Sequence, residues 1–261
     1  MNSKTRRNTI AQQLSDQGEA YIVELAKAFK TSEMTIRRDL DLLEFEGLAR
    51  RIRGGAISVQ SRAFEPPILQ RAANAAEAKR RIGAAAASLL RENETVVIDG
   101  GTTTHQMAKV IGDNFRLTVI TSSLLIATEL STKPLINTIV TGGSVRVDEM
   151  SLIGPRALDS YRDLNCDVLF LSVAGVTPDE GLTEYNIEDA YVKKAAIESV
   201  RRVVVLADAS KLGHVSFVTV SEMQRVDLLI TDASPDNKFI ITIKDQGVEV
   251  LHIEPFHKES N

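Results

Sequence analysis

Between residues 95 and 252, short runs of β-branched and other apolar residues recur along the chain, with helical spacing between many of them. The expected strands are Thr95–Ile98, Leu117–Ile120, Ile136–Val140, Val168–Val173, Val203–Leu206, Leu228–Ile230 and Val248–His252. The expected helices are Ala75–Leu90, Thr102–Ile111, Ser123–Leu130, Pro155–Leu164 and Ile187–Val200. Because parallel strands need crossover connections, this alternation predicts a mostly parallel, doubly wound α/β sheet with helices on both faces.

The first 60 residues follow a different pattern. Apolar residues recur at helical spacing within residues 10–14 and 22–29, and a third helix is expected between Ser32, a favourable N-cap, and Gly47. A Gly-Gly turn then joins two short β-prone segments. These segments are Leu48–Ile52 and Ala56–Val59. Helices followed by a hairpin predict a winged helix-turn-helix.

The third helix has the character of a recognition helix. Ile36, Leu40 and Leu43 fall on one side of an ideal helix, and Arg38 and Asp41 fall on the other. For an isolated helix, we would favour a solvated polar side on which these two residues form an ion pair. The arginine-rich hairpin that follows favours DNA binding. The expected DNA contacts are Arg6, Arg7, Thr35, Arg37, Arg38, Arg50, Arg51 and Arg53, with the helix-turn-helix at about Ala20 to Asp39.

The charge distribution agrees with this division. Residues 1–62 contain 11 basic and 8 acidic side chains, a net charge of +3, whereas the whole chain carries −4, which leaves −7 for the remainder. A basic head on an acidic body indicates that only the head meets a polyanion.

These head residues resemble a known family. The string Ser32-Glu-Met-Thr-Ile-Arg-Arg-Asp-Leu40, followed by Glu46-Gly-Leu48 and Arg53-Gly-Gly-Ala56, is similar to the helix-turn-helix signature of the DeoR family of bacterial transcriptional regulators. The resemblance implies that the Arg-Arg-Asp tract lies on the recognition helix and the glycines lie in the wing. Relatives commonly carry His where this chain has Arg53.

A second motif, Val96-Val-Ile-Asp-Gly-Gly-Thr-Thr-Thr104, runs from an expected strand through a glycine–threonine turn into an expected helix. Glycines let the backbone approach an anion, and a helix N-terminus supplies unpaired N–H groups, so phosphate is the natural ligand. A capped turn without a ligand explains Gly-Gly-Thr equally well. The motif is neither a P-loop nor a dinucleotide fingerprint.

Other expected strands also end in polar loops. In a doubly wound sheet, the loops at the carboxyl ends of the strands line one crevice, where ligands bind. Convergence of these loops predicts a small-molecule site. The expected effector contacts are Asp99, Gly100, Gly101, Thr102, Thr103, Thr104, Thr121, Ser122, Gly142, Gly143, Asp208 and Lys211.

The DeoR resemblance extends through this region, to about residue 255. It rests on the landmarks Asp99–Thr104, Thr141–Gly143, Ile153–Pro155, Gly181–Thr183 and Ala207–Gly213. Membership implies a sugar-phosphate sensor whose fold is similar to ribose-5-phosphate isomerase and the coenzyme A transferases. The expected domains are the winged helix-turn-helix (1–58), a linker (59–74) that contains Pro66-Pro67, and the effector-sensing domain (75–255).

The leading interpretation is a transcriptional repressor of a carbohydrate-metabolism operon that responds to a phosphorylated sugar, and not an enzyme. The alternative is a sugar-phosphate isomerase with an accessory DNA-binding head. The glycine-rich tract and catalytic lysine of those isomerases are not found here. An architectural DNA-binding protein without a ligand is disfavoured by the sensor-like loops.

The remaining expectations concern partners and surroundings. We expect double-stranded operator DNA, a homodimer or tetramer, a cytoplasmic location and no membrane, metal or cofactor. The lone Cys166 excludes an internal disulfide, the four histidines are scattered, and no apolar stretch approaches the length of a signal peptide or a bilayer span. We expect Cys166 to be a small core residue.

Overall fold

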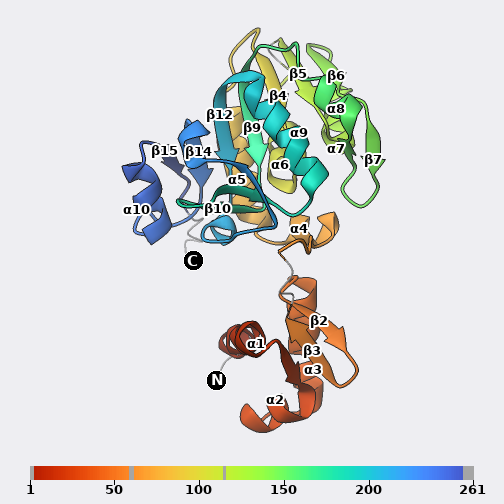
Figure 1. Cartoon of the computed structure of the whole chain (residues 1–261), viewed down its shortest axis with the longest axis vertical. Coiled ribbons are helices and arrows are strands. Elements are labelled where there is room, and N and C mark those ends of the chain that lie inside the picture. The colour runs from red at the N-terminus through yellow and green to blue at the C-terminus, as the bar shows by residue number, and fades with distance from the viewer. Residues whose placement is uncertain (1–2, 59–61, 114–115, 255–261) are drawn as a thin grey trace, which may run out of the picture. The chain divides into compact units, whose positions relative to one another are not determined.

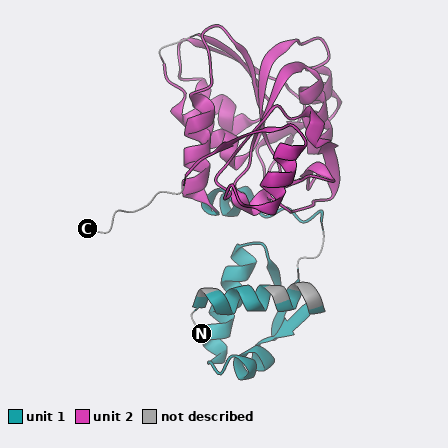
Figure 2. Ribbon diagram, turned by 90° about the vertical axis from the view of Figure 1, so that its left-hand side faces the viewer, with its two compact units in different colours: residues 1–74 teal, residues 75–261 magenta. Residues whose placement is uncertain are grey.

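The computed structural model describes residues 3–58, 62–113 and 116–254. The chain divides into two compact units, residues 1–74 and 75–261 (Figure 2). Val59, at the end of the expected hairpin, lies outside the described residues.

The first unit has the winged-helix architecture that the sequence predicts. Its helices are α1 (Ser3–Gln17), α2 (Ile22–Ala28) and α3 (Glu33–Phe45), and its antiparallel sheet has the order β1 (Glu19–Tyr21), β3 (Gly55–Ser58), β2 (Ala49–Ile52) (Figure 1). The apolar stripe of α3 is buried against Ile10 and Leu14 of α1. Strand β1 was not predicted from the sequence.

The segment expected to be a linker contains helix α4 (Ile68–Ala73). Gln70, which is buried, donates from Nε2 to the carbonyl oxygen of Glu44 at 2.9 Å, and this carbonyl lies in the last turn of α3. A Cβ built on Gly47 would lie 2.8 Å from Pro66 Cγ. The segment therefore packs on the C-terminal end of the recognition helix.

Within the described residues, the second unit is built on a seven-stranded parallel sheet (Figure 1). Its order is β15 (Glu249–His252), β14 (Leu228–Thr231), β12 (Val200–Leu206), β9 (Cys166–Ser172), β4 (Thr95–Ile98), β5 (Leu117–Thr121), β6 (Ile136–Val140). Every strand expected from the sequence is a member of this sheet, so the predicted α/β fold class is confirmed.

Helices cover both faces of the sheet. Helices α5 (Ala76–Ala87), α6 (Thr102–Val110) and α7 (Leu124–Leu130) bury one face, and α8 (Pro155–Asp159), α9 (Ile187–Glu198) and α10 (Lys238–Asp245) bury the other. Helix α10 was not predicted. None of the helices in the described ranges is long and apolar enough to cross a bilayer.

Two small sheets, also not predicted, complete the second unit. Strands β7 (Ser144–Arg146) and β8 (Ser151–Ile153) form a hairpin, and β10 (Gly175–Thr177), β11 (Gly181–Glu184) and β13 (Val218–Ser221) form an antiparallel sheet. Short 3-10 turns lie at Ala209–Lys211 and Met223–Arg225.

Candidate functional site

The recognition helix α3 begins at a side-chain cap and presents its arginines outward. Ser32 Oγ accepts a hydrogen bond from the backbone N–H of Thr35 at 3.2 Å, which satisfies one of the unpaired donors of the first turn. Arg37 is exposed and pairs with Glu33 at 3.0 Å. Arg38 is exposed, and the described residues offer it no hydrogen bond or ion pair.

Arg6 and Arg7 lie on α1 and face Asp39, a buried carboxylate of α3. Arg6 Nε lies 2.5 Å from Asp39 Oδ2, and Arg7 Nη1 lies 3.9 Å from Asp39 Oδ1. The hydrogen bond to Asp39 raises the pKa of Arg6. Since a buried carboxylate needs a cation beside it, Arg6 fastens α1 to the recognition helix, and we leave it out of the proposed DNA surface.

The three arginines of the wing differ in their surroundings. Arg51 Nη1 donates to Asp41 Oδ1 at 2.8 Å and to the carbonyl of Arg37 at 3.2 Å. It therefore ties β2 to α3. Arg50 and Arg53 are exposed, and the described residues give neither of them a partner.

In the second unit, the glycine–threonine turn joins the carboxyl end of β4 to α6. Thr104 Oγ1 donates to the carbonyl of Gly101 at 3.0 Å, and Thr102, Thr103 and Thr104 are all buried. A Cβ on Gly101 would lie 2.5 Å from Ser172 of β9, so close packing of the strands requires glycine there. A Cβ on Gly100 would lie 3.5 Å from Ser123 Cβ and 3.9 Å from Ser151 Cβ, which is ordinary van der Waals contact.

The carboxylate of Asp99 lies in a buried ion network. Its Oδ2 accepts from Ser172 N–H at 3.1 Å and pairs with Lys193 Nζ of α9. Lys193 also donates to the carbonyl of Ser172 at 2.7 Å and lies 3.4 Å from Glu184 Oε2. Burial opposes the ammonium charge, but the two carboxylates outweigh it and raise the pKa of Lys193. Lys193 therefore stays charged and neutralises Asp99.

Asp208, at the carboxyl end of β12, meets a second buried lysine. Lys79 Nζ of α5 lies 3.9 Å from Asp208 Oδ2. Asp208 Oδ1 accepts from the N–H and hydroxyl of Ser210, whereas buried Oδ2 has no hydrogen-bond partner among the described residues. Lys211 lies in the same turn and is half-buried.

The loops after β5 and β6 shape the edge of the sheet beside Gly100. Thr121 and Ser122 are buried, and Thr121 Oγ1 accepts from the N–H of Ser123 at 3.1 Å. Gly142 and Gly143 have φ of 72° and 110°, a conformation that favours glycine. These two glycines turn the chain into the β7–β8 hairpin.

The β7–β8 hairpin is fastened to the start of α9. Arg146 pairs with Asp189, and Ser151 Oγ donates to the same carboxylate at 3.1 Å. Ser151 also forms a β-bridge with Ser123. The sequence did not indicate Arg146, Ser151, Asp189, Lys79 or Lys193 as site residues; the fold brings them to the carboxyl edge from helices and a hairpin.

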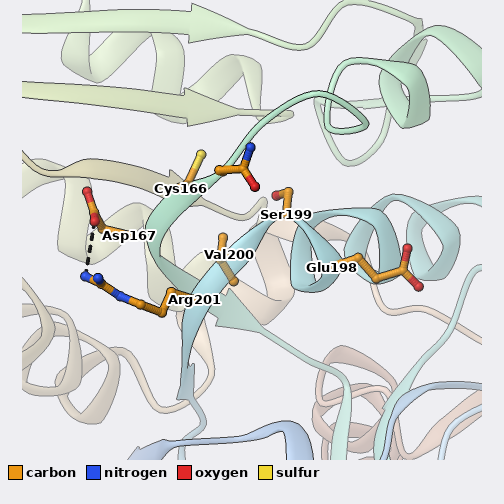
Figure 3. A pocket seen from close by; sticks show the side chains of 7 residues that line it. Cys166, Asp167, Glu198, Ser199, Val200 and Arg201 are labelled. Atoms are coloured by element: carbon orange, nitrogen blue, oxygen red, sulfur yellow. Dashed lines mark hydrogen bonds and ion pairs between the residues drawn. The ribbon is translucent and has the colours of Figure 1, made fainter.

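A cavity of about 310 Å³ opens at the amino ends of β9 and β12, the opposite edge of the sheet (Figure 3). It is lined by Asn165, Cys166, Asp167, Glu198, Ser199, Val200 and Arg201. Asp167 pairs with Arg201 at 3.2 Å and accepts from Thr95 N–H and hydroxyl. Burial raises the pKa of the Cys166 thiol, which belongs to the apolar core as expected. The described residues contain no cluster of His, Cys, Asp and Glu suited to a metal ion.

Comparison with known proteins identifies both units. The DeoR-like helix-turn-helix domain matches residues 6–62, and the DeoR C terminal sensor domain matches residues 74–233. The transcriptional regulator GolR of Listeria innocua serovar 6a is 32% identical over 245 residues, with 94% of this chain and 96% of that protein covered. The regulator GlpR of Haloferax volcanii is 34% identical, with 94% and 96% covered. The glycerol-3-phosphate regulon repressor of Escherichia coli K12 is 30% identical, with 96% and 99% covered.

Among solved structures, ribose 5-phosphate isomerase A of Methanocaldococcus jannaschii covers 53% of this chain and 55% of its own, with 14% identity and a TM-score of 0.41. The full-length relatives are named as regulators and repressors rather than enzymes. With matches to both domain types and to relatives over nearly its whole length, the chain belongs to the DeoR family of DNA-binding transcriptional regulators.

Proposed function

We propose that this regulator represses genes of carbohydrate metabolism and that a phosphorylated sugar, bound at the carboxyl edge of the parallel sheet, controls its hold on the operator. The observation that carries the proposal is the turn at Gly100, where the backbone at the end of β4 enters the N-terminus of α6. The N-terminus of α6 and the backbone of a glycine lie beside Gly100, with Ser123 Cβ and Ser151 Cβ 3.5 and 3.9 Å from a Cβ built on it. Such a turn suits a phosphate group because it offers N–H donors at a helix N-terminus.

The two buried lysines give this edge its electrostatic character. Lys193 lies between Asp99 and Glu184, so it reduces the repulsion between the Asp99 carboxylate and an approaching anion. Asp208 Oδ2 makes no hydrogen bond among the described residues, although Lys79 lies 3.9 Å from it, and we infer that it accepts a hydrogen bond from a sugar hydroxyl. Lys211 lies in the same turn as Asp208 and adds a cation. We infer that phosphate binds near Gly100 and the sugar extends toward Asp208.

For DNA, the proposed contacts reduce to the exposed arginines of α3 and the wing. Arg38 is the leading base contact, and Arg50 and Arg53 are the leading phosphate contacts, because all three are exposed and free of ion pairs among the described residues. Since one recognition helix reads one half-site, we propose that the regulator acts as a homo-oligomer.

A screen of phosphorylated sugars against the full chain tests the effector proposal. The effector should raise the melting temperature, because a ligand of the native state stabilises by about 3 kcal/mol at a hundredfold excess over its Kd. The unphosphorylated sugar should not. The same compound should change the affinity for an operator fragment recovered by selection with the chain. Millimolar sugar phosphates that leave both readouts unchanged would contradict the proposal.

Arg38→Ala should weaken operator binding by about 1–3 kcal/mol and relax the preference at one base pair, because a bidentate base contact is lost. Binding is measured by fluorescence anisotropy with operator and scrambled duplexes. Arg162→Ala, which removes the same charge from an exposed site in the second unit, is the control. Equal affinity of the Arg38 variant and the control for the operator would refute the assignment.

A further inference from the structure

We infer that the outer edge of β6 is a self-complementary interface at which two copies of this chain pair their sheets. Strand β6 ends the order of the seven-stranded sheet, with β5 on its inner side. Within the described residues, β6 packs against β5 and α7, and no strand pairs with its outer side (Figure 1). An edge of this kind is a template for a further strand.

The hydrogen bonds of β6 show which backbone groups point outward. Thr141 N–H donates to Thr121 of β5, and Leu117 N–H donates to the carbonyl of Leu135. Because the groups alternate along a strand, the odd-numbered residues of β6 face β5 and the even-numbered ones face the open edge. Those outward residues are Ile136, Thr138 and Val140, which are symmetric about Thr138.

This symmetry permits an antiparallel pairing about a two-fold axis at Thr138. The Thr138 residues of the two copies would exchange two backbone hydrogen bonds, and Val140 N–H of each copy would donate to the Ile136 carbonyl of the other. In that register every outward residue meets an outward residue. A shift of one residue would place outward residues opposite inward ones, and a shift of two would leave one of the three outward residues of each copy without an outward partner in the other strand.

The side chains fit the same arrangement. Residues directly opposite in an antiparallel pair lie on one face of the sheet, so the two Thr138 side chains would be neighbours across the axis. Val140, 40% exposed, would pack on Ile136 of the second copy, and Ile139, 44% exposed, would be covered on the opposite face.

The edge also lacks the residues that keep edge strands apart. Ile136–Val140 contains no charged residue and no proline, whereas β15, the opposite edge, carries Glu249 and His252. Charges and prolines on an edge strand oppose pairing with another chain. We infer that the strand that pairs with β6 comes from a second copy of this chain, because the pairing is self-complementary. This inference also rests on the proposed function, in which a two-fold operator requires two recognition helices.

Sedimentation velocity of the full chain and of Thr138→Lys tests the interface. The parent should sediment as a dimer or larger even-numbered assembly. The lysine variant, with two like charges directly opposite, should dissociate with at least a hundredfold rise in the dimer Kd. Leu251→Lys on β15, at an exposed position, should keep the parent assembly. Circular dichroism melting of each variant verifies that the fold is retained.

Cysteine cross-linking tests the register without a disruptive substitution. Thr138→Cys should form a disulfide-linked dimer under mild oxidation, since facing residues lie within disulfide range, and Cys166 is buried and gives little background. Ile139→Cys should not, because it faces Asn137 of the second copy. A monomeric parent, a Thr138→Lys variant that keeps its assembly, or equal cross-linking at both positions would overturn the inference. Neither experiment uses DNA or effector, so a negative result here would count against the interface and not against the proposed function.

Discussion

Lys193→Met should lower the free energy of unfolding of the chain by about 3–5 kcal/mol, the cost expected when one partner of a buried ion pair is removed. The loss leaves Asp99 and Glu184 buried without their cation. Urea unfolding followed by circular dichroism gives the value. Lys194→Met is the matched control, because Lys194 is only partly buried and makes a cation–π contact with Tyr191 instead of an ion pair among the described residues.

Two further measurements separate the ion network from simple packing. Asp99→Asn should cost less in the Lys193→Met background than in the parent, a coupling that a double-mutant cycle measures. The pKa of Lys193 is raised, so its stabilisation is fully present below the ordinary lysine value of 10.5 and disappears only as the pH rises through the higher folded value. Equal stability of the Lys193 and Lys194 variants at pH 7 would show that the network contributes nothing.

Gly100→Asp should weaken sugar-phosphate binding by about a thousandfold, because two like charges about 4 Å apart in a partly buried site repel by about 4 kcal/mol. The added Cβ makes ordinary van der Waals contact with Ser123, and a circular dichroism melt of each variant checks that the fold is retained. Gly100→Asn has the same shape without the charge and should lose much less affinity. The readout is the effector-induced change in melting temperature and in operator binding.

The head should keep its affinity for the operator in the Gly100→Asp variant, because its contacts belong to the first unit. The variant therefore represses constantly, since only a ligand with different affinities for two states can shift their equilibrium. An aspartate variant that responds to effector like the asparagine variant would place the phosphate elsewhere and leave this loop as a turn.

The sheet could be predicted because its strands are short, β-branched runs buried on both faces. The predicted Thr95–Ile98 and Ile136–Val140 match β4 and β6 residue for residue. Strand β1 was missed because Glu19–Tyr21 is too short for an alternating pattern and forms only by pairing with β3. The strands of the small sheets were missed for the same reason, since runs of three or four residues are too short to show an alternating pattern.

The polar sites were predictable only in part, since spacing along the chain does not reveal ion partners. Lys193 and Lys194 are adjacent and look alike in sequence, yet the fold brings the first to a carboxylate 94 positions away. Arg6 and Arg51 look like phosphate contacts for the same reason, whereas the structure pairs them with Asp39 and Asp41. The turn at Gly100 could be predicted because glycines and threonines directly after a strand indicate a turn into a helix.

The strand order of the parallel sheet also sets the order in which the second unit can fold during synthesis. Strand β4 emerges first, β5 and β6 add to one side of it, and β9, β12, β14 and β15 then add to the other side in turn. Each later strand therefore pairs with a strand that precedes it in the chain. The pairing of Val96 in β4 with Val168 in β9 closes a long loop and joins the second half of the sheet to the first. The β6 edge therefore belongs to the half of the sheet that comes first in the chain, so the interface inferred there depends on residues 95–140 and not on the strands that follow.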